Sequence, residues 1–228
     1  MLTCKSLVLE QGAFRLAADV SFEAGKITAV MGASGAGKST LLSAIAGFVT
    51  PANGDICWQD QSILNQSPGK RPVSILFQDN NLFPHLTVQQ NVALGLGKHR
   101  DAQRVRDVLG QVGLADFLTR KPNQLSGGQQ SRVGIARMIV AARPVVLLDE
   151  PFAALGPGLK SEMLALTRQM LADTGCTILM VTHDPDDAHI TADAVAWIDN
   201  GVVQAPRETN GIFADPPTSM KTYLGAMG

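Results

Sequence analysis

A glycine-rich segment follows a short apolar run near the start of the chain. The run covers residues 27–31, and residues 32–39 then read Gly-Ala-Ser-Gly-Ala-Gly-Lys-Ser. This spacing of glycines, lysine and serine matches, without a mismatch, the pattern of a loop that surrounds the phosphates of a nucleotide. Such a loop joins a buried strand to a helix, because the N–H groups of the first helical turn then face the phosphate oxygens. The segment therefore requires strand, loop and helix at this point, and it predicts nucleotide binding.

The residues after the loop favour the helix that this site requires. Residues 38–46 contain no helix breaker, their apolar side chains share one face, and Gly47 stands where a helix end favours left-handed backbone. We expect Lys38 to reach the outer phosphates and the hydroxyl of Ser39 to ligate Mg²⁺. The expected nucleotide-binding residues of the loop are Gly32, Ser34, Gly35, Ala36, Gly37, Lys38, Ser39 and Thr40.

Length and composition limit the remaining possibilities. The chain has 228 residues, 45% of them hydrophobic and 17% charged, which allows an ordinary buried core and predicts one domain with two lobes. The net charge is −1 without a block of like charges, so nucleic acid is not an expected partner. We also expect no signal peptide, no membrane span and a cytosolic location, with three scattered cysteines that stay reduced.

The apolar pattern along the chain alternates between strands and helices, except in the middle. Turn residues and apolar runs predict strands at 5–9, 14–22, 27–31, 55–59, 73–77, 145–148, 177–181 and 194–198, with a hairpin turn at 199–201. Residues 82–142 carry a helical pattern that includes a capping box at 87–90, and further helices are expected near Pro157 and after Asp184. This order predicts an α/β fold in which the helical stretch is a lobe on one nucleotide-binding core.

A second candidate site lies at the end of the apolar strand 145–148, where Asp149 and Glu150 follow directly. A buried parallel strand delivers acids in this way to the carboxyl edge of its sheet. In an enzyme that hydrolyses nucleotides, the aspartate holds Mg²⁺ and the glutamate polarises the water that attacks the γ-phosphate. Together with a phosphate-binding loop, the pair predicts hydrolysis as well as binding.

The segment Leu125-Ser126-Gly127-Gly128-Gln129 narrows the class of protein. Its serine and glutamine favour a capped helix start, whose free N–H groups suit a second side of a phosphate. Placed between the two other motifs, it resembles the signature sequence of ATP-binding cassette proteins. The resemblance covers nearly the whole chain and includes Gln78, similar to the Q-loop residue of that family, and His183, similar to its switch histidine.

The resemblance implies a P-loop ATPase (RecA-like) core with an N-terminal antiparallel β subdomain and an inserted α-helical subdomain. The chain would be a single domain, 1–228, with residues 1–81 and 143–228 in the core and residues 82–142 in the helical subdomain.

The resemblance also assigns roles to residues of the site. Two copies of the chain would pair head to tail, so that each ATP lies between the phosphate-binding loop of one copy and the signature of the other. Gln78 would join Ser39 and Asp149 around Mg²⁺, while Glu150 and His183 would be the catalytic pair. The signature residues that would contact ATP are Ser126, Gly127, Gly128 and Gln129.

Three positions depart from the family pattern. The family usually has an aromatic residue in its first strands that stacks on adenine, but Gln11 stands near that place and Phe14 is the nearest aromatic candidate. The residue after the signature is Gln130 rather than arginine. The loop after Glu150 carries Gly156 where the family has an aspartate at the dimer seam, so we expect weakened coupling between the two sites.

The segment 82–88, Leu-Phe-Pro-His-Leu-Thr-Val, resembles the corresponding segment of importer ATPases for sugars, iron and thiamine. It would flank a groove that receives the coupling helix of an integral membrane permease, which in turn works with a solute-binding protein. Residues 71–83 and the short ending resemble most the ATP-binding subunits of bacterial thiamine importers. The resemblance thus implies ATP hydrolysis coupled to import, by a peripheral subunit at the cytoplasmic face of the inner membrane.

The residues alone leave other functions open. Selectivity for the solute lies in the binding protein and the permease, so an importer of iron or sugar is also compatible with this chain. A soluble cassette ATPase that acts on nucleic acid is a further alternative, against which the lack of a basic patch argues. A nucleotide-sensing module without turnover, because of Gly156, is another, and a phosphate-release assay separates it.

Overall fold

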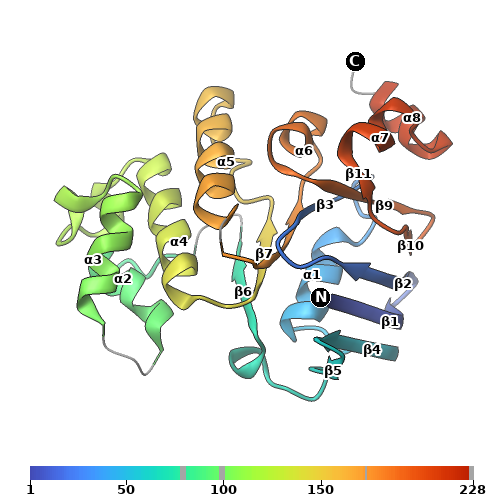
Figure 1. Ribbon diagram of the computed structural model, residues 1–228, viewed down its shortest axis with the longest axis horizontal. Helices are drawn as coiled ribbons and strands as arrows, with labels where there is room; N and C mark the ends of the chain where they lie inside the picture. Colours follow the sequence, from blue (N-terminus) through green and yellow to red (C-terminus); the bar gives the residue numbers. More distant parts are fainter. Residues whose placement is uncertain (78–80, 98–100, 173, 226–228) are drawn as a thin grey trace.

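A computed structural model describes residues 1–77, 81–97, 101–172 and 174–225. The strands are β1 (Leu2–Gln11), β2 (Phe14–Phe22), β3 (Ile27–Gly32), β4 (Asn53–Trp58), β5 (Gln61–Ser62), β6 (Val73–Leu76), β7 (Val145–Asp149), β8 (Thr177–Val181), β9 (Ala194–Asp199), β10 (Val202–Val203) and β11 (Arg207–Glu208). They form one mixed sheet in the order β5-β4-β1-β2-β10-β9-β3-β8-β7-β6, with β11 paired to β9 (Figure 1).

Helices cover both faces of this sheet. They are α1 (Lys38–Ala46), α2 (Val88–Ala93), α3 (Ala102–Gln111), α4 (Gly127–Ala141), α5 (Pro157–Ala172), α6 (Pro185–Thr191), α7 (Thr209–Ala214) and α8 (Thr218–Gly225), with short 3-10 turns at Pro68–Lys70, Leu94–Leu96, Ala115–Phe117 and Pro122–Gln124. Among the described helices, none combines the length and the apolar character needed to cross a bilayer.

The parallel half of the sheet positions the site. Strands β6, β7, β8, β3 and β9 are neighbours in parallel, and nearly every residue of β3, β7 and β8 is buried. Because these strands are covered on both faces, their sequences are continuous apolar runs. Their carboxyl ends therefore meet along one edge, where the loops after β3, β7 and β8 begin.

Alternate residues of these strands belong to two separate cores. Val30, Leu147 and Val181 pack with α1 and the N-terminal strands, whereas Met31 and Leu148 pack with the helices on the other side. In Figure 1, α1 lies on one face of the sheet and α5 and α6 lie on the other. The period of two along a strand thus separates the core beneath the phosphate loop from the core that supports the helices.

The N-terminal strand is longer than the sequence pattern predicts. It runs over residues 2–11 rather than 5–9, and it pairs antiparallel with both β2 and β4. The register shifts between Cys4 and Leu7, and Ser6 has a φ of 45°. Inward-facing residues therefore change from even positions, such as Cys4, to odd positions, such as Leu7 and Leu9. This bulge breaks the alternation on which the prediction depended.

The middle of the chain is helical, as its pattern predicts. The described residues between 81 and 142 contain α2, α3 and α4 with three 3-10 turns and no strand, and they gather at the end of the sheet marked by β6 (Figure 1). The capping box at Thr87 and Gln90 is confirmed, because each side chain bonds the backbone N–H of the other. We propose that residues 82–142 form a subdomain on a core made of residues 1–81 and 143–228.

Candidate functional site

The phosphate-binding loop connects β3 to α1, as the sequence predicts. Gly35 and Gly37 have φ values of 77° and 96°, a backbone region that favours glycine. Gly37 is also packed closely, because a Cβ atom there would lie 2.3 Å from the ring of Phe14. The loop thus needs glycine at position 37 for two reasons, and its N–H groups stand at the start of a helix.

Lys38 lies inside this loop rather than in solvent. Its Nζ atom donates hydrogen bonds to the backbone oxygens of Gly32, at 2.9 Å, and Ala33, at 3.0 Å. Burial lowers the pKa of Lys38, while the negative charges of Glu150 and Asp149 oppose that shift. The ammonium is therefore held at the loop, where it can form a charge-assisted contact with an anion.

Ser39 and Asp149 meet across the sheet edge, although 110 positions separate them in the chain. The Ser39 hydroxyl donates to Oδ1 of Asp149 at 2.8 Å. Burial raises the pKa of Asp149, with the charge of Glu150 adding to this effect, whereas the bond from Ser39 and the charge of Lys38 lower it. A hydroxyl and a carboxylate in contact are oxygen ligands of the kind that Mg²⁺ prefers, so these residues fit that ion. Gln78, the third expected ligand, lies outside the described residues.

Glu150 and His183 lie side by side at the ends of adjacent strands. The Nδ1 atom of His183 is 3.3 Å from Oε1 of Glu150. Glu150 has a φ of 45°, and its N–H donates to the backbone oxygen of Val181 at 3.2 Å, which turns the chain away from the sheet. Both side chains remain partly exposed to solvent, 52% for the histidine and 29% for the glutamate. A water molecule therefore has access to both.

The signature forms a separate helix start. Ser126 is the N-cap of α4, and it forms a capping box with Gln129, as the sequence predicts. Gly128 packs closely, because a Cβ atom there would lie 2.8 Å from the side chain of Leu159 on α5. Among the described residues, no hydrogen bond joins this turn to the phosphate-binding loop.

Phe14 lies beside the loop but is engaged with the protein. Its ring contacts Gly37 and packs against the core on the α1 side of the sheet. Gln11 and Phe14 are paired at the end of the β1–β2 ladder. The assignment of Phe14 as the adenine contact stays a prediction.

A partly buried charged cluster next to His183 was not predicted from the sequence. The Nζ atom of Lys160, on α5, lies 2.7 Å from a carboxylate oxygen of Asp184 and 2.7 Å from one of Asp187. Thr182 donates to the second oxygen of Asp187 at 2.5 Å. Burial alone would lower the pKa of Lys160, but the hydrogen bonds to both aspartates outweigh it and raise that pKa. No short motif contains these residues, so only their contacts reveal the cluster.

The chain is similar in sequence to known ATP-binding proteins of importers. The thiamine import ATP-binding protein ThiQ of Cereibacter sphaeroides is 51% identical over 230 residues, which covers 99% of this chain and 100% of that protein. The protein of the same name from Ruegeria sp. is 48% identical over 231 residues, with coverage of 99% and 100%.

Solved structures show the same architecture. A dimeric bacterial ABC transporter cassette matches with a TM-score of 0.78 and 28% identity, covering 92% of this chain and 99% of that one. The same values hold for a post-hydrolysis dimer bound to ADP and phosphate. Residues 17–153 match the ABC transporter family, and this match spans the phosphate-binding loop, the signature and the two acids. The chain therefore belongs to the ABC transporter family and is one of its ATP-binding ATPases.

Proposed function

We propose that this chain powers the import of thiamine by hydrolysing ATP between two of its copies, at the membrane-bound permease of a transporter. The observation that carries the proposal is the sheet edge where Ser39, Asp149, Glu150 and His183 come together, while the signature forms the start of a different helix, α4. One chain supplies the carboxylate for Mg²⁺, the general base and the phosphate-binding loop. A second copy would supply the signature.

The phosphate-binding loop orients the nucleotide in this proposal. Backbone N–H groups of residues 32–40 hold the phosphates, and Lys38 adds a charge-assisted contact to the outer ones. Ser39 and Asp149, with Gln78, would hold Mg²⁺, which neutralises charge that develops on the phosphate oxygens when it is bound.

Glu150 is the general base. Its carboxylate accepts a proton from the water that attacks the γ-phosphorus atom, the bond to the β–γ bridging oxygen breaks, and ADP and phosphate are the products. His183 lies 3.3 Å from this carboxylate and has half of its side chain exposed, so it can orient the water and contact the γ-phosphate. The backbone of Glu150 is in the left-handed region, with a φ of 45°.

The signature of the second copy closes the site. The first N–H groups of α4 have no backbone partner within the helix, although that of Gln129 donates to the Ser126 hydroxyl, and no acidic residue lies in the first turn, so this turn suits an anion. Ser126, Gly127, Gly128 and Gln129 would thus contact the γ-phosphate held by the other copy. The dimeric cassette structures that resemble this chain support such a pairing.

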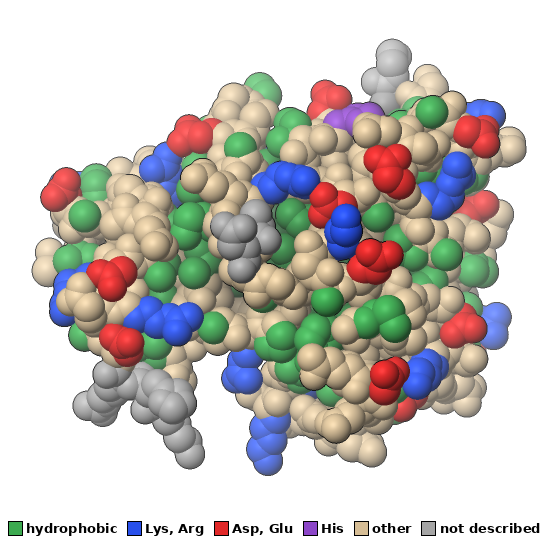
Figure 2. Space-filling model, in the orientation of Figure 1, with side chains coloured by type: hydrophobic (Ala, Val, Ile, Leu, Met, Phe, Trp, Pro, Cys, Tyr) green, Lys and Arg blue, Asp and Glu red, His purple; other side chains and the backbone are tan. Residues whose placement is uncertain are grey.

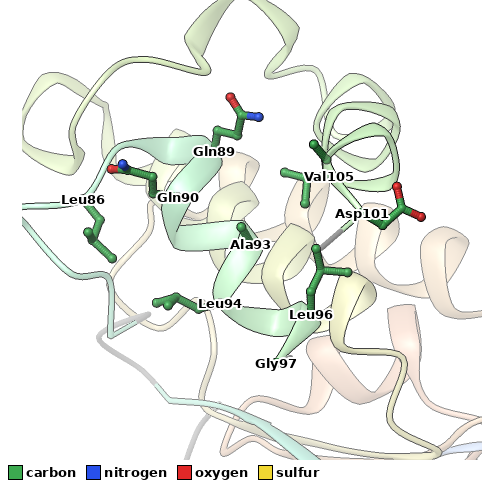
Figure 3. A pocket seen from close by; sticks show the side chains of 10 residues that line it. Leu86, Gln89, Gln90, Ala93, Leu94, Leu96, Gly97, Asp101 and Val105 are labelled. Atoms are coloured by element: carbon green, nitrogen blue, oxygen red, sulfur yellow. The ribbon is translucent and has the colours of Figure 1, made fainter. Parts of the chain in front are cut away.

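The membrane permease would dock beside the segment 82–88. Phe83 and Leu94 expose 47% and 48% of their surface there, so this part of the molecule presents two large apolar side chains to solvent. A pocket of about 510 Å³ opens between α2 and α3, lined by Leu86, Leu94, Leu96 and Val105 (Figure 3). A second one of about 330 Å³ lies between β6 and α4 and includes Phe83. We place the coupling helix of the permease against this apolar surface.

This docking segment is tied to the signature helix. Asn91 is fully buried, and its side chain bonds the backbone of Phe83, Leu86 and Thr87, which fixes the loop. Arg137 on α4 donates to the backbone oxygen of Asn81 at 2.9 Å. A displacement of this segment by the permease would therefore be transmitted to α4, whose first turn would face the nucleotide held by the other copy. On the face drawn in Figure 2, basic and acidic side chains are interspersed, in keeping with a protein rather than a nucleic acid as partner.

The names of the two relatives above carry the choice of thiamine, since both are called thiamine import ATP-binding proteins. The chain would work at the cytoplasmic face of the inner membrane, with a solute-binding protein as an indirect partner. The test is to isolate the transporter that contains this chain and measure ATP hydrolysis with binding protein loaded with thiamine, iron or a sugar. Stimulation by thiamine alone is expected. Stimulation by another solute would overturn the choice of thiamine, and no phosphate release at all would overturn the ATPase.

A further inference from the structure

The C-terminal helix reaches the site through a single phenol group. The Oη atom of Tyr223, on α8, donates a hydrogen bond to the backbone oxygen of His183, across 40 positions of the chain. Tyr223 is the only tyrosine in the protein. Figure 1 shows α8 at the end of the chain, on the same side of the sheet as α6.

The tyrosine is held in place from its own side. Its ring packs edge-on against Trp197 of β9, with the ring centres 5.3 Å apart. The indole N–H of Trp197 donates to the hydroxyl of Ser219, one turn earlier on α8, at 3.0 Å. Met220, between them, is fully buried. The helix is therefore packed on the sheet, and the phenol group is presented in a defined position.

The histidine segment is held from the other side by the charged cluster. The N–H of Asp184 donates to the Thr182 hydroxyl at 3.1 Å, and the carboxylate of Asp184 pairs with Lys160. These contacts fix the residues before and after His183. The carbonyl group of His183 itself is bonded by Tyr223, so this bond sets how the peptide unit after the histidine is turned.

We propose that Tyr223 is a positioning residue for ATP hydrolysis, which keeps the imidazole of His183 facing Glu150. The inference rests on the proposed role of His183. A backbone rotation at residue 183 that shifts its Cα atom would carry the Cα–Cβ bond with it and move the ring away from a partner that is now 3.3 Å distant. The hydrogen bond opposes this rotation, so the ring is already aligned when a water molecule enters.

The test removes one oxygen atom. Tyr223→Phe keeps the ring on Trp197 and loses only the bond to His183, while Ser219→Ala loses the bond from Trp197 to α8 and touches nothing at the site. In the purified full-length chain with Mg-ATP, we expect kcat of Tyr223→Phe to fall about three- to tenfold, the effect of one lost hydrogen bond. KM and the Kd for ATP should stay unchanged, and Ser219→Ala should match the wild type in every constant.

A spectroscopic readout separates positioning from mere packing. The NMR signal of the His183 imidazole, identified by its loss in His183→Ala, should broaden or split in Tyr223→Phe and stay sharp in Ser219→Ala. Equal kcat values in Tyr223→Phe and Ser219→Ala, or an unaltered His183 signal, would overturn the proposal. These outcomes are distinct from a failure of the proposed function, because in that case His183→Ala would itself turn over at the normal rate.

Discussion

Two helix starts in this molecule are built to face phosphate, and they differ in the charge they carry. At the start of α1, Lys38 lies beside the backbone of the loop, and Asp149 and Glu150 stand close enough to influence its pKa. At the start of α4, Ser126 and Gln129 cap each other, and the first turn has no acidic residue. The first helix start therefore has the groups that chemistry needs, while the second offers only N–H donors. Changes at α1 should alter binding or turnover, and changes at α4 should alter assembly.

The largest effect, on turnover, is expected at Glu150, beside the start of α1. Glu150→Gln keeps the size of the side chain but removes the base, so turnover should fall by about 10²–10⁴ while ATP still binds. Phosphate release and nucleotide titration measure the two separately. Glu10→Gln, at an exposed position far along β1, is the matched control and should keep full activity. Normal hydrolysis by Glu150→Gln would show that this edge does not carry the chemistry.

The next effect concerns binding at the same helix start. Lys38→Ala should weaken ATP binding by about 10- to 100-fold, since a charge-assisted contact contributes roughly 1.5–3 kcal/mol. Titration with a fluorescent ATP analogue measures the Kd. Lys70→Ala, at an exposed position in a 3-10 turn, should leave the Kd unchanged. Equal affinities for the two variants would remove the distinction drawn between the two helix starts.

The second helix start should respond differently. Ser126→Arg should leave ATP binding by the single chain intact but prevent ATP-dependent dimers, because a bulky cation blocks the turn that faces the other copy. Ser126→Ala loses the cap alone, at a cost of about 1 kcal/mol in stability, and should still dimerise. Size-exclusion chromatography in the Glu150→Gln background compares them. A dimer that survives Ser126→Arg would contradict a site shared between copies.

A smaller effect is expected in α5, which carries Lys160. Lys160→Met leaves the buried carboxylate of Asp187 with Thr182 as its remaining partner, so the free energy of unfolding should drop by about 1–3 kcal/mol at pH 7. Lys221→Met breaks an exposed ion pair with Asp215 and should cost less than about 0.5 kcal/mol. Urea denaturation gives both values. Equal losses of unfolding free energy would show that the cluster around Lys160 stabilises the protein no more than an exposed ion pair does.

This loss should also depend on pH. Burial raises the pKa of Asp184, but hydrogen bonds from Lys160 and the N–H of Asp186 outweigh it, so that pKa lies below its ordinary value of 3.8. A lowered carboxylate pKa adds stability above the unfolded value, and this stability is lost as pH falls through the folded one. The difference between wild type and Lys160→Met should thus shrink below about pH 4.

The smallest effect concerns the loop that leads from the acid to α5. A Cβ atom at Gly156 would meet nothing within 4 Å, so Gly156→Asp fits without strain and should change stability by only a few tenths of a kcal/mol. We expect the wild type to hydrolyse ATP slowly with weak cooperativity, and the substitution to raise both turnover and the Hill coefficient. Gly158→Asp, equally free of close contacts, is the control. Unchanged kinetics would mean that this loop does not link the two sites.

Local chemistry explains why much of the site was predictable. The phosphate-binding loop, both capping boxes and the strand that ends in Asp149 each depend on residues within a few positions of one another. Glycine backbone freedom, cap hydrogen bonds and apolar runs act over that range, so the residues alone predict them. The three cysteines are unpaired, as their scattered positions predicted.

Features that depend on distant partners were not predictable. The length of β1 follows from pairing with β2 and β4 around a bulge, and neither α7 nor α8 has a pattern that marked it. The roles assigned to Gln78 and Phe14 stay predictions.

By itself, the sequence determined that this protein binds and hydrolyses a nucleotide, because the groups that do so are grouped in short motifs. The tertiary structure alone decided how those motifs are held. Lys160 reaches Asp184 across 24 positions, and Tyr223 reaches His183 across 40. A contact between residues so far apart exists only once the sheet has brought their helices together, so no local pattern encodes it. The reactive groups are thus specified by short motifs, whereas the contacts that align them form only in the folded protein.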